Sequence, residues 1–103
     1  MIRQIVLVRL SPDAPADAVP KMAAALLALR AEFSQIEDMC VGEDLRVRPD
    51  NYDFGYTADF ATVDDYLAFR EDERHWETIR TAVTPYLAER AGVVMEIPDP
   101  ADP

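Results

Sequence analysis

The sequence predicts one α+β domain, built as a four-stranded antiparallel sheet with helices on one face. Its 103 residues leave room for a single domain. Four segments show the β-branched or alternating pattern of strands, and the segments between them repeat apolar residues at the three- and four-residue spacing of helices. Half of the residues are hydrophobic, so the chain can fold around a core.

Residues 2–10 form the first predicted strand, because β-branched residues are frequent in this segment. One face is apolar except for Gln4, whose amide either hydrogen-bonds within the fold or faces a polar pocket. The opposite face carries Ile5 and Leu7, so both faces of the strand need cover. Helices can cover one face, and in so short a chain we expect a second subunit to cover the other.

A helix over residues 16–33 and a less regular strand over residues 36–45 come next. Gly42 allows a bulge or bend in that second strand. Residues 52–60 are the clearest strand of the sequence, because aromatic residues alternate there with small and polar ones. This pattern predicts a strand with one aromatic face.

Thr62 is the expected N-cap of a short helix. A charged segment, residues 71–74, then leads to His75. His75 begins a longer helix that Pro85 should kink or divide. Residues 91–97 form the last predicted strand, and residues 98–103 are expected to be a mobile tail.

The resulting element order, β-α-β-β-α-α-β, is typical of a ferredoxin-like domain, here over residues 1–97. The second face of its sheet would expose an apolar patch that includes Ile5 and Leu7, and a contiguous patch marks an interface. Two sheets pressed face to face would bury this patch. We therefore expect a homodimer with the architecture of a dimeric α+β barrel.

Composition and charge exclude several classes of partner and site. Ten Lys and Arg residues against 20 Asp and Glu give a net charge of -10, which disfavours nucleic acid and anionic membranes. Cys40 is the only cysteine and His75 the only histidine of the sequence. No disulfide framework and no multi-histidine or cysteine-rich metal site is therefore expected. Three scattered glycines form no phosphate-binding loop, and we expect neither a metal ion nor a cofactor.

The first residues, MIRQIVLVRL, contain an apolar run too short for the core of a signal peptide. No stretch approaches the roughly 20 apolar residues of a membrane span. The expected location is therefore cytoplasmic.

His75 is the candidate proton-handling residue, because histidine is the side chain whose ordinary pKa lies near neutrality. Alternatively, its ring packs or caps the start of the helix. The aromatic row of residues 52–60 is either the core face of a strand or the lining of a cavity. As the candidate site we take His75 as the catalytic residue and, as residues that contact the ligand, Gln4, Phe54, Tyr56, Phe69 and Trp76.

Four segments carry a family resemblance in the right order over about residues 1–97. They are the opening MIRQIVLVRL, the strand end Val41 to Leu45, the strand from Tyr52-Asp53 to Asp59-Phe60, and Tyr66 to His75 before the last helix. With these motifs the chain resembles the stress-responsive A/B barrel domain (Dabb) family. The resemblance implies a ferredoxin-like fold that dimerises through its sheets.

The resemblance also implies a site. A polyketide cyclase similar to this chain performs an aldol condensation with a histidine at the position of His75, aided by a tyrosine and a first-strand histidine. Phe69 and Gln4 stand at those two positions here. The expected function is binding of a small carbonyl-bearing or aromatic ligand, with His75 as general acid or base in a cyclase- or lyase-like proton transfer. The alternatives are a non-catalytic stress-associated or structural dimer and a monooxygenase-like dimeric barrel.

Overall fold

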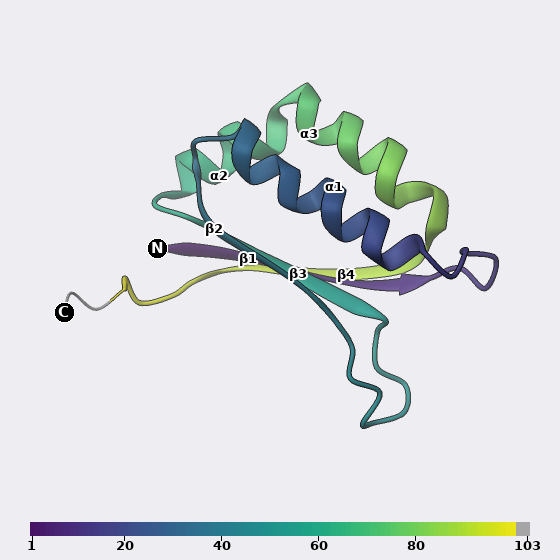
Figure 1. Ribbon diagram of the computed structural model, residues 1–103. Helices are drawn as coiled ribbons and strands as arrows, with labels where there is room; N and C mark the ends of the chain where they lie inside the picture. Colours follow the sequence, from purple (N-terminus) through teal and green to yellow (C-terminus); the bar gives the residue numbers. More distant parts are fainter. Residues whose placement is uncertain (101–103) are drawn as a thin grey trace.

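A computed structural model describes residues 1–100 and has two layers, a sheet and a set of helices that cover one of its faces (Figure 1). The elements are, in chain order, β1 (Ile2–Leu10), α1 (Ala18–Glu32), β2 (Ile36–Glu43), β3 (Phe54–Phe60), α2 (Val63–Glu71), α3 (Glu73–Thr78), the π-helical segment η1 (Ile79–Val83), the 3-10 turn η2 (Thr84–Tyr86) and β4 (Leu87–Glu96). The sheet has the order β2-β3-β1-β4, and all neighbouring strands are antiparallel. This confirms the predicted ferredoxin-like α+β fold.

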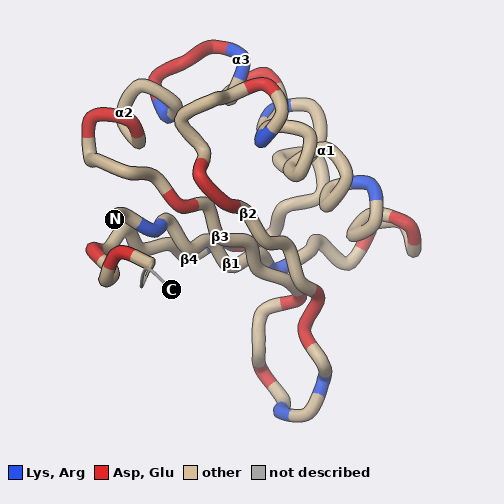
Figure 2. The backbone as a smooth tube through the Cα atoms, turned by 60° about the vertical axis from the view of Figure 1, so that its left-hand side comes forward, with Lys and Arg blue, Asp and Glu red and all other residues tan. Residues whose placement is uncertain are grey.

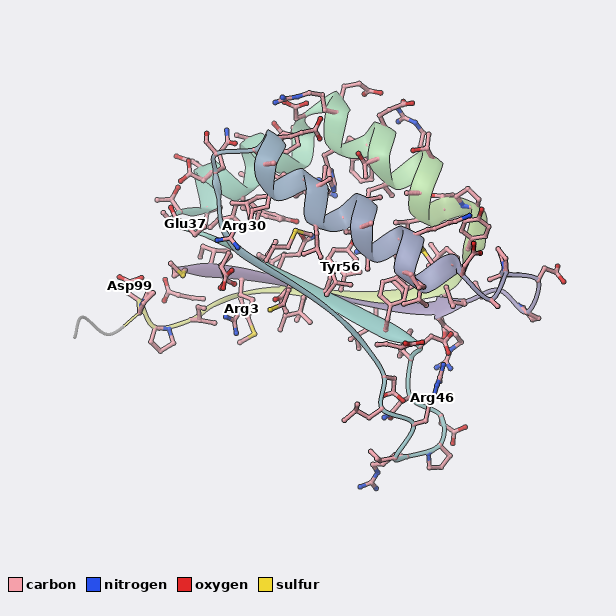
Figure 3. The ribbon with its side chains drawn as sticks, viewed as in Figure 1. Arg3, Arg30, Glu37, Arg46, Tyr56 and Asp99 are labelled. Carbon is pink, nitrogen blue, oxygen red and sulfur yellow. The ribbon has the colours of Figure 1, made fainter. Side chains whose placement is uncertain are left out.

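The core lies between the two layers. Tyr56 lies on the side of the sheet that the helices cover, and Arg3 lies on the other side (Figure 3). Each large apolar side chain buried here stabilises the fold by roughly 1.5–3 kcal/mol. The largest fully buried side chains are Phe33, Phe54, Phe60, Met22, Leu26 and Leu29.

The sheet face away from the helices is partly apolar. It carries Leu7, Val93 and Met95, which are exposed in the single chain, and a salt bridge between Arg3 and Asp59. Strand β1 therefore has one covered face and one uncovered face. The two-sided apolar pattern of the sequence correctly places apolar residues on both.

The last helical region is divided, and Pro85 was expected to kink or divide it. The helix α3 runs into the π-helical η1 and then the 3-10 turn η2, which contains Pro85. Proline has no N–H group and cannot continue an α-helix, so the helical pattern ends there. Strand β4 begins at Leu87, before the expected residue 91, because it pairs with β1 along its whole length, up to Leu10 opposite Leu87.

Two further local features were expected from the sequence. Gly42 allowed a bulge or bend in strand β2, but the register shift of this strand lies between Ile36 and Asp38, and Gly42 pairs in register with Gly55. Thr62 is confirmed as the N-cap of α2, since its hydroxyl accepts a hydrogen bond from the Asp65 N–H at 3.1 Å.

The N-terminus and the described segment that follows β4 lie at the same side of the sheet (Figure 1). The Ile97 N–H donates to the Met1 carbonyl at 2.9 Å, and Asp99 pairs with the N-terminal ammonium group at 2.7 Å. Residues 101–103 of the expected tail lie outside the described residues. Among the helices of residues 1–100, none has the length and apolarity needed to cross a bilayer.

Candidate functional site

A cavity of about 410 Å³ lies between the helices and the β1–β4 half of the sheet. This volume falls within the range of small-molecule binding sites. The sheet contributes a floor that includes Gln4, Val6, Tyr56, Arg90 and Gly92. The helical layer contributes a roof that includes Tyr66, Arg70, His75, Trp76, Ile79 and Val83.

Local sequence places His75 at the roof. Asp72 caps α3 by accepting a hydrogen bond from the Arg74 N–H at 2.8 Å, and the His75 N–H donates to the Asp72 carbonyl at 3.1 Å. The imidazole centroid lies 4.4 Å from that of Phe69 and 4.9 Å from that of Trp76. Two aromatic rings therefore hold the imidazole, and only 7% of the residue is exposed.

The surroundings of His75 favour the neutral form of its ring. Burial lowers its pKa, and the positive charges of Arg70 and Arg90 lower it further. The Arg70 backbone and the Asp72 carboxylate act in the opposite direction but do not reverse the shift. Nδ1 is buried and has no hydrogen-bond partner within residues 1–100. A neutral imidazole in such a position can accept a proton from a ligand.

Tyr56 and Gln4 supply polar groups to the floor. Burial raises the pKa of Tyr56, although the nearby Arg90 charge partly opposes this, so the hydroxyl stays protonated and can donate a hydrogen bond. Gln4 is half-buried, and of its two expected roles the structure shows it at the cavity.

The structure brings together four of the six residues predicted for the site: Gln4, Tyr56, His75 and Trp76 line the cavity. Phe54 does not, and lies instead beside a shallow hollow at the start of β3. Phe69 does not line it either. Its ring lies 5.0 Å from that of Phe33 and 5.3 Å from that of Phe60, so it supports the imidazole from the core side.

Several lining residues were absent from the predicted site, above all Arg70, Arg90 and Tyr66. Arg90 was missed because the last strand was expected to begin at residue 91, so no face could be assigned to it. Pairing the last strand with all of β1 would have placed Arg90 opposite Val8, on the covered face. Tyr66 and Arg70 are one helical turn apart on α2, which is the signal that they share a face.

Acidic residues outnumber basic ones along α2 and at the beginning of α3 (Figure 2). Within residues 1–100, no group of three or more His, Cys, Asp and Glu side chains is arranged to hold a metal ion. The polar groups of the cavity residues are the imidazole of His75, the phenols of Tyr56 and Tyr66, the amide of Gln4, the hydroxyl of Thr84, the indole of Trp76 and the guanidinium groups of Arg70 and Arg90.

Comparison with solved structures finds the same fold in several proteins. A dimeric ferredoxin-like protein of unknown function from Thermobifida fusca is 29% identical, with a TM-score of 0.84 over 93% of this chain and 90% of that one. A hydroxynitrile lyase from Passiflora edulis is 19% identical, with a TM-score of 0.84 over 98% and 96% of the two chains. An antibiotic biosynthesis monooxygenase is 13% identical, with a TM-score of 0.72 over 96% and 100%.

The similarity to the latter two structures shows a shared fold and is not evidence that this chain catalyses their reactions. A sequence comparison with curated proteins finds no match. The family model described as Stress responsive A/B Barrel Domain matches residues 2–97, nearly the whole chain. The chain therefore belongs to the stress-responsive A/B barrel domain (Dabb) family.

Proposed function

We propose that the protein is a homodimer whose subunits each bind a small carbonyl-bearing or aromatic ligand, with His75 as proton acceptor. The observation that carries this proposal is a cavity of about 410 Å³ that His75 lines, together with the burial that lowers the pKa of this histidine. A small aromatic ketone fits a volume of this size.

The polar groups of the cavity suit a carbonyl compound. The Tyr56 hydroxyl and the Gln4 amide can donate hydrogen bonds to a carbonyl oxygen. Tyr66, Trp76, Ile79 and Val83 offer aromatic and apolar surface to the rest of the ligand.

The reaction that suits these groups is removal of a proton from the carbon next to the carbonyl. The C–H bond breaks, its electron pair forms the enolate, and the proton moves to the His75 imidazole. A donor at the carbonyl oxygen stabilises the negative charge that develops there. Return of the proton to the carbon completes the step. Alternatively, the enolate attacks a second carbonyl, and the imidazolium gives its proton to the alkoxide that forms.

Dimerisation through the open sheet face is supported by its exposed apolar residues, Leu7, Val93 and Met95. It is also supported by the dimeric state of the ferredoxin-like neighbour from Thermobifida fusca. Pairing two such faces removes apolar surface from water and leaves the cavities on the outer, helical sides.

Deuterium exchange tests the proposed proton transfer. Acetophenone in deuterium oxide should exchange its methyl protons faster with the protein than with buffer, and NMR measures the rate. His75→Gln keeps much of the side-chain volume but provides no base, so we expect a rate loss of about 100-fold or more. An exposed loop variant, Arg48→Gln, is the control and should keep the rate. Equal exchange by the protein and by His75→Gln would contradict the role of His75.

A non-catalytic ligand-binding dimer is the second candidate function. It is favoured by the state of Nδ1, which is buried and has no hydrogen-bond partner within residues 1–100, so no described group activates this nitrogen as a base. Under this alternative acetophenone binds in the cavity but its exchange rate equals that in buffer.

A further inference from the structure

We propose that the ligand of this cavity carries an anionic group, and that Arg90, assisted by Arg70, is its counter-charge. This rests on the ligand binding proposed above and specifies the ligand class: a carbonyl compound that also bears a carboxylate or a comparable negative charge.

The position of Arg90 on β4 directs its side chain to the cavity floor. Arg90 pairs with Val8, a buried residue on the covered face of β1. A Cβ atom at residue 92 would lie 3.2 Å from Nη2 and 4.0 Å from Cζ of Arg90. The guanidinium therefore lies close over the backbone of Gly92, and the missing side chain at residue 92 leaves space for it.

Arg90 and Arg70 are unusual among the basic residues of this acidic chain. Seven of the ten Lys and Arg residues have a carboxylate within salt-bridge distance. The other three, Arg90, Arg70 and the loop residue Arg48, have no such partner among the carboxylates of residues 1–100, and of these only Arg90 and Arg70 line the cavity. Arg70 instead lies over the Trp76 ring, with Cζ 6.0 Å from the ring centroid. Both guanidinium groups are therefore free to pair with a ligand.

The two charges act on the atoms that would meet the ligand. Arg90 lowers the pKa of the Tyr56 hydroxyl against the larger effect of burial, and both arginines add to the lowering of the His75 pKa by burial. The described residues that line the cavity include no Asp or Glu. His75 itself has a buried ring nitrogen without a partner. The cavity is thus a positive site in a chain with a net charge of -10.

A guanidinium suits a carboxylate because its planar donors match the two carboxylate oxygens. The acidic outer surface repels anions at long range, so a cation within the cavity is required for an anion to be preferred there. This placement selects ligands by charge as well as by size.

Two matched ketones test the inference. Para-acetylbenzoate and para-methylacetophenone differ by the replacement of a methyl group with a carboxylate, and calorimetry measures their dissociation constants. We expect the protein to prefer the carboxylate, with a preference that weakens as salt is added. Arg90→Gln should weaken para-acetylbenzoate binding by roughly 10-fold or more and leave para-methylacetophenone binding nearly unchanged.

Arg48→Gln is the matched control, since it removes one positive charge from the exposed β2–β3 loop and should keep the preference. Arg90→Lys should retain part of it. Equal affinity for the two ketones, or a preference that survives Arg90→Gln, overturns the anionic assignment and leaves the proposed function intact. If neither ketone binds, the proposed function fails together with the inference.

Discussion

The imidazole of His75 lies 4.4 Å from the ring of Phe69, at an interplanar angle of 46°. Phe69 is 2% exposed and also contacts Phe33 edge-on at 5.0 Å. One aromatic side chain thus joins the cavity roof to the core beneath α1. The orientation of the candidate catalytic ring depends on core packing.

Phe69→Ala should destabilise the protein by roughly 3–5 kcal/mol, the range for removal of a buried phenylalanine ring. The loss combines lost burial with a void between Phe33, Phe60 and His75. Urea denaturation at fixed protein concentration measures it. Trp76→Ala, at the more exposed neighbour of His75, should cost less. A loss of stability below about 1 kcal/mol for Phe69→Ala would show that neighbouring side chains fill the void, which would contradict a supporting role of this ring.

His75 should make stability depend on pH near neutrality. Burial lowers the folded-state pKa of His75 below its ordinary value of 6.5, so the unfolded chain binds a proton first as the pH falls. The stability associated with the neutral ring is present above about pH 6.5 and is lost progressively below it. Denaturation of the protein and of His75→Gln across this range measures the difference. Parallel stability curves would contradict the lowered pKa.

Asp53 anchors the base of the β2–β3 loop. Burial acts to raise its pKa, but the Leu10 N–H and the Arg46 guanidinium, each 2.6 Å from a carboxylate oxygen, lower it overall. A carboxyl with a lowered folded pKa stabilises the protein above its unfolded pKa, and this stabilisation is lost as the pH falls through the folded pKa. Asp53→Asn should therefore destabilise at neutral pH and converge with the parent protein in acid.

Asp50→Asn, on the exposed part of the same loop, is the control for this prediction and should have a small effect at every pH. Thermal melting of the three proteins between acid and neutral pH gives the comparison. A constant gap between Asp53→Asn and the parent protein would show that the ionised carboxyl has no special role.

Leu7→Glu should convert the proposed homodimer to a monomer. Leu7 lies on the open sheet face and is 39% exposed in the single chain, so the change costs the subunit little but places a charge in the proposed interface. Leu27→Glu on α1, at a residue that is 44% exposed, is the matched control and should stay dimeric. Light scattering after size-exclusion chromatography measures the mass. A dimeric Leu7→Glu protein would rule out this face as the interface.

The fold could be predicted from sequence because its signals are local and agree with one another. The aromatic alternation of residues 52–60 reflects burial of Phe54, Tyr56 and Phe60 under the helices, although the strand itself begins at Phe54. The apolar residues on both sides of β1 reflect one core face and one open face. Each pattern is set by periodicity and burial, which a single sequence carries.

The site could be predicted only in part, because a cavity depends on packing between distant segments. His75 was chosen because its side chain can transfer protons, and Tyr56 because it lies on the aromatic face of its strand. Both residues line the cavity. Phe54 and Phe69 have the same aromatic character, but their rings fill core space away from the cavity. The face on which Arg90 lies depends on the register of β4 against β1. Because Pro85 lies just before β4, the sequence did not show at which residue this strand begins.

Titration of the protein with acetophenone, followed by NMR of the imidazole, tests the binding site most directly. His75 is the only histidine of the chain, so its ring signals are identified without further variants. A ligand seated in the cavity should produce saturable shifts of the His75 ring and of the Tyr56 ring across the floor. Unchanged His75 signals at millimolar ligand, or shifts confined to the open sheet face, would contradict a ligand site beside this histidine.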